Sequence, residues 1–112
     1  MLQKAHLPQG RLRILETTDL HMHLLHYNYF ADREDTSVGL MRMAGLIAQL
    51  RREAEGPVLL CDNGDFLQGN PLADHVAHAL EAGTIHPMIV AMNALGYDAI
   101  TLGNHEFDYG LS

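Results

Sequence analysis

Three short polar clusters in this sequence combine residue types that bind metal ions. They are Asp19-x-His21, Gly64-Asp65 and Gly103-Asn104-His105. Asp19 and His21 lie two positions apart, so both side chains can point the same way from an extended segment. Carboxylate, imidazole and amide groups suit Mn²⁺, Zn²⁺, Fe or similar ions and differ from the thiolates of a structural zinc site. The residue types therefore predict a metal site.

Each cluster directly follows a predicted β-strand, and these strands cover residues 11–18, 58–61 and 99–102. Apolar and polar side chains alternate in residues 11–18. The other two segments are apolar runs, which are typical of strands buried on both faces of a parallel sheet. The carboxyl ends of parallel strands meet at one edge of an open α/β sheet, where loops carry ligands. The sequence thus predicts an α/β fold in which the three clusters form one site.

Three helices are predicted between these strands. The first covers residues 40–54, where the apolar stripe that includes Met43 is expected to pack in the core. The second begins at Asn70, which precedes a proline, and is closed by Gly83. The third covers residues 87–95. The alternation of strands with helices is typical of a parallel sheet.

The remaining segments carry weaker signals. Residues 1–10 are predicted to be a flexible lead-in, and residues 24–38 a long functional loop. Cys61 lies in an apolar run and is expected to be a small buried residue. His75 and His78 are expected to be surface histidines on the second helix.

Composition narrows the range of partners. A chain of 112 residues is long enough for one small domain, and 47% hydrophobic residues is a globular composition. The formal charge is −7, from 14 acidic and 7 basic residues, without a basic block. We therefore expect neither a nucleic-acid polymer nor a membrane as a partner. Residues 1–10 lack the apolar segment of a signal peptide, and no run approaches the roughly 20 residues that span a bilayer.

Ordinary turns are an alternative explanation for each cluster, because Asp, Asn and Gly are common in turns. Turn formation does not require histidine, however, and His21 and His105 follow two different strands. A shared metal site is therefore the favoured interpretation.

The clusters resemble the first three motifs of the calcineurin-like metallophosphoesterases. Their surroundings resemble more narrowly the 5′-nucleotidase group and its 2′,3′-cyclic-nucleotide 2′-phosphodiesterase/3′-nucleotidase branch. The stretches that carry this likeness are Thr17-Thr-Asp-Leu-His21, Asp62-Asn-Gly-Asp-Phe-Leu-Gln-Gly69 with Pro71-Leu-Ala-Asp74, and Thr101-Leu-Gly-Asn-His-Glu-Phe-Asp-Tyr-Gly110. The resemblance extends from about Arg11 to the last residue. It implies the N-terminal portion of a layered β-sandwich with flanking helices.

The resemblance also implies a two-metal mechanism. Asp19 and His21 would hold one divalent ion, Asp65 would bridge it to a second ion, and Asn104 would bind that second ion. The ions would be Mn, Zn, Fe, Mg or Co. A metal-bridging hydroxide would attack the phosphorus of a small-molecule nucleotide substrate. His105 would act catalytically, either by stabilising charge or by protonating the leaving ribose oxygen.

Three further residues have open roles. Asp108 or Glu106 would orient His105 through a hydrogen bond, and a purely structural role for Glu106 is an equal alternative. His23 either contacts the metal ligands or the substrate, or it is a simple loop residue.

The sequence departs from the family pattern in one respect. Later Gly-His and Gly-His-x-His motifs, which complete the two-metal centre in the family, are absent from these residues. We therefore expect residues 11–112 to be the N-terminal part of a catalytic domain, incomplete and inactive in isolation, with the remaining ligands beyond residue 112. The alternatives are a 5′-nucleotidase or nucleotide-sugar hydrolase, or a non-catalytic metal-binding or interaction fragment. The resemblance implies a periplasmic location.

Overall fold

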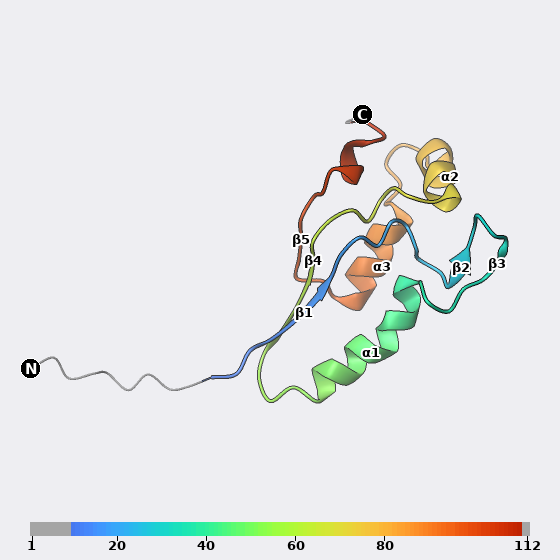
Figure 1. Cartoon of the computed structure of the whole chain (residues 1–112). Coiled ribbons are helices and arrows are strands. Elements are labelled where there is room, and N and C mark those ends of the chain that lie inside the picture. Colours follow the sequence, from blue (N-terminus) through green and yellow to red (C-terminus); the bar gives the residue numbers. More distant parts are fainter. Residues whose placement is uncertain (1–9, 111–112) are drawn as a thin grey trace, which may run out of the picture.

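The computed structural model describes residues 10–110, and three parallel strands form its sheet. They are β1 (Arg13–Thr17), β4 (Val58–Asp62) and β5 (Ala99–Ile100), in the order β1-β4-β5 (Figure 1). The predicted α/β class and the parallel pairing are confirmed. β5 is shorter than the predicted strand at 99–102. The predicted lead-in lies outside the described residues except for Gly10.

Three helices accompany the sheet, as predicted: α1 (Leu40–Arg52), α2 (Pro71–Ala79) and α3 (Pro87–Leu95). The Asn70 side chain accepts the Ala73 N–H and caps α2, while left-handed Gly96 ends α3. The prediction that Gly83 closes α2 is wrong. The helix ends at Ala79, because Leu80 takes an extended conformation with ψ of 121°.

The hydrophobic core lies between the helices and the loops that leave the strands. Its buried members are Met22, Leu40, Phe66, Ala73, Val76, Met88, Ala91 and Met92. Met22 and Phe66 come from the loops after β1 and β4, and they are 0% and 1% exposed. These two side chains anchor the polar clusters to the body of the molecule.

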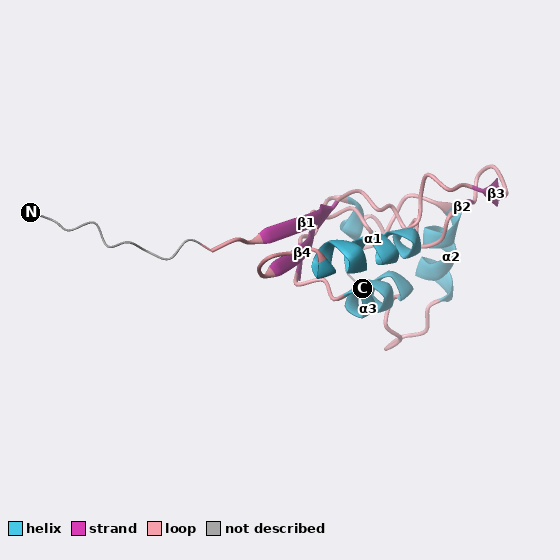
Figure 2. Cartoon of the chain, turned by 90° about the horizontal axis from the view of Figure 1, so that it is seen from below, coloured by secondary structure: helices cyan, strands magenta, loops and turns pink. Residues whose placement is uncertain are grey.

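Helices cover only one face of the sheet within residues 10–110 (Figures 1 and 2). Leu60 is 1% exposed, whereas Ile14 and its neighbour in register, Leu59, are 61% and 39% exposed. Burial of β4 on both faces is therefore a wrong prediction, and Cys61 is half-buried on the open face. β5, which was also expected to be buried, is exposed because it lies at the sheet edge.

Met43 is a further correction, because it is 37% exposed and not part of the core. Within α1 the buried residues are Leu40 and Ile47. Met43 lies beside Leu46, which is also exposed, where α1 borders an open hollow. The apolar stripe of α1 is thus wider than the part of the helix that packs against the rest of the molecule.

The segment predicted as a long loop contains a small antiparallel ribbon, formed by β2 (Tyr27–Asn28) and β3 (Arg33–Glu34). The Asn28 side chain accepts the N–H groups of Phe30 and Ala31 and so forms the turn. This ribbon projects from the end of the molecule (Figure 2). His75 and His78 are exposed on α2, as predicted.

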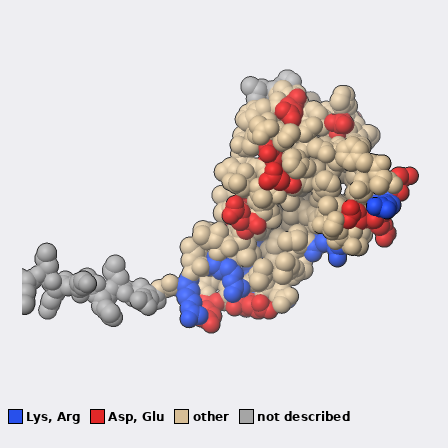
Figure 3. All heavy atoms as spheres, viewed as in Figure 1, with Lys and Arg blue, Asp and Glu red and all other residues tan. Residues whose placement is uncertain are grey.

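Charge is unevenly distributed over the surface. On the face seen in Figure 3, the upper part, over α2 and the C-terminal segment, carries acidic but no basic side chains. The basic residues of that face lie lower, toward the start of β1 and around the ribbon. A cation would therefore be attracted to the carboxyl ends of the strands. Among the described residues, no helix is long and apolar enough to cross a membrane.

Candidate metal centre

The loops after β1 and β4 run side by side and bring the first two clusters together. Asp19 N–H donates to the carbonyl of Gly64 at 3.0 Å, and His21 N–H donates to that of Asp65 at 2.8 Å. Met22 N–H continues the pairing to the carbonyl of Phe66 at 3.0 Å. Backbone hydrogen bonds beyond the ends of the strands therefore fix Asp19 and His21 against Asp65.

Strained backbone occurs at the same three residues, and also at Met22 and Asp32. Asp19, His21 and Asp65 have φ values of +53°, +45° and +61°, in the left-handed region that favours glycine. Such conformations cost on the order of 1 kcal/mol each and concentrate at functional sites. Neither Asp19 nor His21 is adjacent to a glycine in the chain, so this strain was not evident from the sequence.

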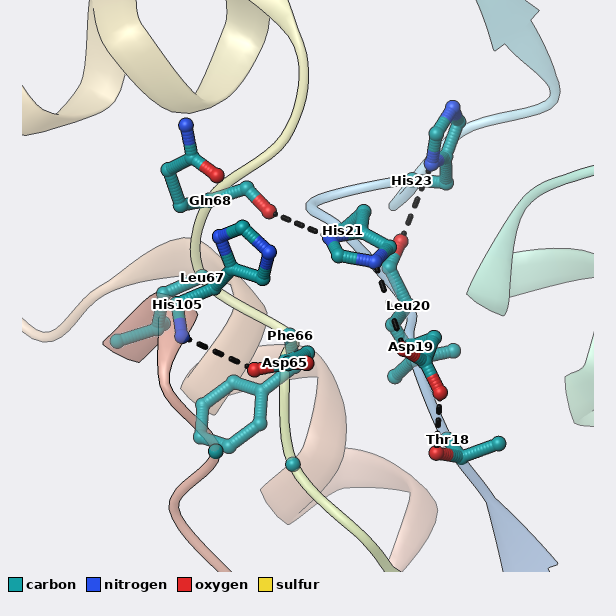
Figure 4. Close-up of polar contacts among 12 residues, drawn as sticks. Thr18, Asp19, Leu20, His21, His23, Asp65, Phe66, Leu67, Gln68 and His105 are labelled. Atoms are coloured by element: carbon teal, nitrogen blue, oxygen red, sulfur yellow. Dashed lines mark hydrogen bonds and ion pairs between the residues drawn. The ribbon is translucent and has the colours of Figure 1, made fainter. Parts of the chain in front are cut away.

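The His21 ring is oriented for metal binding (Figure 4). Its Nδ1 lies 2.9 Å from the carbonyl oxygen of Gln68 and donates a proton there, because a carbonyl only accepts. Nε2 is then the free position, and it lies 3.6 Å from Asp19 Oδ1. A histidine ligand commonly donates its other N–H to a carbonyl in this way. His21 and Asp19 therefore present one nitrogen and one oxygen to a common point.

Asp65 joins this pair to the third cluster. Its Oδ1 accepts the backbone N–H of His105 at 3.0 Å, and the rings of His21 and His105 meet edge-on with centroids 5.1 Å apart. One ligand atom each from His21, Asp65 and His105 lies within 4.8 Å of the other two. Nitrogen and oxygen donors at this spacing fit a divalent ion of the kind predicted.

Asp108 holds the His105 ring. His105 Nδ1 lies 2.7 Å from Asp108 Oδ2, and this hydrogen bond raises the pKa of His105 above its ordinary value. Burial opposes the shift, while the charges of Asp108, Asp65 and Glu106 add to it. With Nδ1 engaged, Nε2 is the atom that can give a proton to a substrate.

Of the two roles predicted for Glu106, its contacts fit the structural one. Its carboxylate accepts the backbone N–H groups of Asp65, Phe66, Leu67 and Gly103, at 2.6 to 3.1 Å. Partial burial raises the pKa of Glu106, but these hydrogen bonds outweigh it and hold the pKa below its ordinary value. Glu106 thus binds the backbone, and the His105 ring is held by Asp108.

His23 and Asn104 complete the predicted residues. His23 Nδ1 lies 3.1 Å from the carbonyl oxygen of Leu20, and its ring points away from His21 and His105 (Figure 4). It lines a hollow of about 560 Å³ against α1, which Asp19 also lines. Asn104 directly precedes the short helix η1 (His105–Phe107), is exposed, and does not cap that helix with its side chain.

Two positioning contacts were missed by sequence reasoning. The Asn70 side chain caps α2 and also donates to the carbonyl of His21 at 2.9 Å, so one buried amide serves two segments. Gly69, at φ +141°, lies against the His21 ring, where an added Cβ would come within 2.7 Å of the His21 side chain. The Asn-Pro pair reveals the cap, but its second hydrogen bond depends on tertiary contact.

Comparison with known proteins agrees with this geometry. Residues 12–112 match the profile of the calcineurin-like phosphoesterases. The chain belongs to this family. A calcineurin-like phosphoesterase from Bacillus subtilis, known from its crystal structure, matches 93% of the chain with a TM-score of 0.87 and 47% identity.

Two sequence relatives are nucleotide phosphoesterases by name. The chain is 50% identical over 101 residues to a 2′,3′-cyclic-nucleotide 2′-phosphodiesterase/3′-nucleotidase from Yersinia enterocolitica. It is 40% identical over 109 residues to a 5′-nucleotidase from Bos taurus. The matches cover 89% of this chain in both cases, but only 15% and 17% of the two relatives, and 32% of the Bacillus subtilis structure. The chain thus spans only part of the length of these relatives.

Proposed function

We propose that this chain forms part of a divalent-metal-dependent phosphohydrolase that cleaves 2′,3′-cyclic nucleotides and 3′-nucleotides. One observation carries the proposal: donor atoms of His21, Asp65 and His105 lie within 4.8 Å of one another, and Asp19 Oδ1 lies 3.6 Å from His21 Nε2. The similarity to the Yersinia enterocolitica relative supports the choice of substrate. The ions would be Mn, Zn, Fe, Mg or Co, and the two ions proposed would supply Lewis-acid activation of water and neutralise phosphoryl charge.

The residues of the chain have distinct roles in this proposal. Asp19 and His21 would hold the first ion, and Asp65 would contribute to both ions through Oδ2, since Oδ1 already accepts the His105 N–H. Asn104 would help to hold the second ion. The remaining ligands are assigned to polypeptide other than these 112 residues, consistent with the 15% of the Yersinia enterocolitica relative that the chain spans.

His105 gives a proton from Nε2 to the leaving ribose oxygen. The Asp108 hydrogen bond favours the protonated ring that this role requires, and it fixes the direction of Nε2. Loss of that proton to the leaving oxygen converts a poor leaving group into an alcohol. His105 also lies against His21, so the proton would be delivered beside a residue that would hold the first ion.

Substrate choice is tested in the longest natural polypeptide that contains this chain. Phosphate release from 3′-AMP and opening of 2′,3′-cyclic AMP are expected, with lower activity on 5′-AMP. Cleavage of 5′-AMP alone would instead establish the alternative 5′-nucleotidase activity, which the Bos taurus relative supports. Asp65→Asn should reduce kcat at least about 100-fold, whereas Asp32→Asn in the exposed ribbon turn should leave it unchanged.

Metal binding is tested separately in the chain itself. Electron paramagnetic resonance of Mn²⁺ should show binding that Asp65→Asn removes and Asp32→Asn preserves. Binding without hydrolysis in the longer polypeptide would support the other alternative, a non-catalytic metal-binding module. A periplasmic location is part of the proposal, and cell fractionation followed by immunodetection tests it.

A further inference from the structure

Glu106 lies where the second and third clusters come closest together. Gly64 and Gly103 face each other here: a Cβ added to Gly64 would lie 2.6 Å from Gly103 N, and one added to Gly103 would lie 2.1 Å from Asp65 Oδ1. The absence of both side chains lets the loops after β4 and β5 approach each other. The approach also turns several backbone N–H groups inward, and these groups need acceptors.

The Glu106 carboxylate supplies those acceptors with a different pattern at each oxygen. Oε2 accepts one N–H from each loop, from Asp65 at 2.8 Å and from Gly103 at 2.6 Å. Oε1 accepts two successive N–H groups of the loop after β4, from Phe66 at 2.6 Å and Leu67 at 3.1 Å. One oxygen therefore joins the loops, and the other shapes the turn that presents Asp65.

These contacts also argue against Glu106 as a metal ligand. A carboxylate has about four acceptor sites, and the four N–H groups occupy them. Two of the donors are the N–H of Asp65 itself and the N–H of Gly103, which directly precedes Asn104. Displacement of the carboxylate would therefore move residues of both clusters together.

We propose that Glu106 is a positioning residue that sets the separation between Asp65 and the Asn104–His105 pair. This inference rests on the proposed metal site, and it adds a specific structural requirement for that site. Metal ligands supported by such outer contacts typically lose 10- to 100-fold in affinity when the contact is removed. The effect arises through the backbone, because Glu106 contacts the N–H groups and not the donor atoms of the ligands.

Two substitutions separate position from charge. Glu106→Gln removes the charge and places an NH₂ group against N–H donors. Glu106→Asp keeps the charge, but its side chain is one methylene shorter and cannot reach both loops. Glu81→Gln, at an exposed position in the turn after α2, is the matched control for the loss of one negative charge.

The test measures Mn²⁺ affinity by electron paramagnetic resonance and the visible spectrum of bound Co²⁺, with circular dichroism to verify folding. We expect Glu106→Gln to weaken binding about 10- to 100-fold and Glu106→Asp about 10-fold, with an altered Co²⁺ spectrum in both. Glu81→Gln should match the wild type. If Glu106→Gln does not fold, the affinity and spectrum of Glu106→Asp decide the question.

The possible outcomes distinguish this inference from the proposed function. Wild-type affinity and an unchanged Co²⁺ spectrum in Glu106→Asp would overturn the positioning role, since only charge would then matter. If the wild-type chain binds no metal, or binds it equally well after Asp65→Asn, the metal site itself is wrong and this inference is overturned with it.

Discussion

His21 illustrates how a single side chain is prepared for its role by neighbours that have no reactive groups. The Gln68 carbonyl fixes the ring proton on Nδ1, Gly69 leaves space for the ring, and Asn70 holds the His21 backbone. These residues follow one another in the chain but act on a residue nearly fifty positions earlier. The orientation of His21 is therefore a property of two segments together.

Gly69→Ala tests this arrangement. The added methyl group would overlap the His21 side chain, so we expect Mn²⁺ affinity to fall about 10-fold or more. Gly83→Ala is the matched control, because Gly83 also has positive φ but no atom within 4 Å of an added Cβ. It should cost about 1 kcal/mol of stability and leave metal affinity unchanged. Equal losses of affinity in both variants would contradict the steric explanation.

Asp62 holds the start of the loop that carries Asp65, but burial of its charge lowers the stability of the fold. It is 2% exposed, accepts the Gly64 N–H at 2.9 Å and the Thr17 hydroxyl at 2.5 Å, and Thr17 in turn meets Tyr97 at 2.8 Å. Burial raises the pKa of Asp62 despite these hydrogen bonds. The folded state therefore favours the protonated acid, and ionisation of Asp62 lowers stability as the pH rises through its folded pKa.

Asp62→Asn should therefore raise the melting temperature at pH 7. The neutral amide can accept the Gly64 N–H through its oxygen and donate its NH₂ to the Thr17 hydroxyl, without burying a charge. The advantage should be smaller at pH 4.5, because a larger share of wild-type Asp62 is then protonated than at pH 7. Thermal unfolding followed by circular dichroism at both pH values measures the difference. An advantage of the same size at both pH values would exclude the ionisation of Asp62 as its source.

The helices and strands differ in how far local sequence determines their limits. α3 begins at Pro87 and ends at Leu95, where Gly96 takes φ of +70°, as its capping residues predict. The end of α2 was misplaced, because the chain turns at Leu80 before it reaches Gly83. β5 was expected to extend to residue 102, but it ends at Ile100, with one further backbone hydrogen bond from Thr101 N–H to the Asp62 carbonyl. Ends with their own capping residues were thus predictable, whereas ends set by contacts with other segments were not.

Phe66 connects the loop after β4 to the helical core. Its side chain should therefore be essential both for the stability of the fold and for the position of Asp65. Phe66→Ala removes a side chain that is 1% exposed, at an expected cost of about 3–5 kcal/mol. Phe66→Leu retains most of the volume and should cost about 1–2 kcal/mol while loosening the position of Asp65. Urea unfolding gives the stabilities and Mn²⁺ binding gives the effect on the site. Phe30→Ala is the control, since Phe30 is 76% exposed and its loss should change stability by less than about 0.5 kcal/mol.

The molecule as a whole has an uncovered apolar surface. Ile14 and Leu59 are neighbours on the open face of the sheet, and Leu12, which directly precedes β1, is 56% exposed. The family resemblance implied the N-terminal portion of a layered sandwich, and the main sheet of residues 10–110 is accordingly a three-stranded sheet with helices on one face. An apolar sheet face of this kind promotes association.

Ile14→Lys should therefore reduce self-association of the 112-residue chain. We expect the wild type to show a concentration-dependent increase in sedimentation coefficient that is diminished in the variant. Ile85→Lys is the comparison, because Ile85 is equally exposed, at 62% against 61%, but lies outside the sheet. If both substitutions reduce association equally, net charge and not the sheet face controls it.

The sequence by itself determined that three helices form and that three parallel strands are each followed by a polar cluster. It also determined which residue types gather at the carboxyl ends of the strands. These features follow from apolar periodicity, capping residues and the geometry of parallel sheets, all of which are local or general. Tertiary structure alone decided that Glu106 joins two loops, that His23 points away from the site, and that Met43 and Leu59 remain exposed. The physical reason is that each depends on which distant segment lies against the residue, and nothing in its own neighbourhood records that contact.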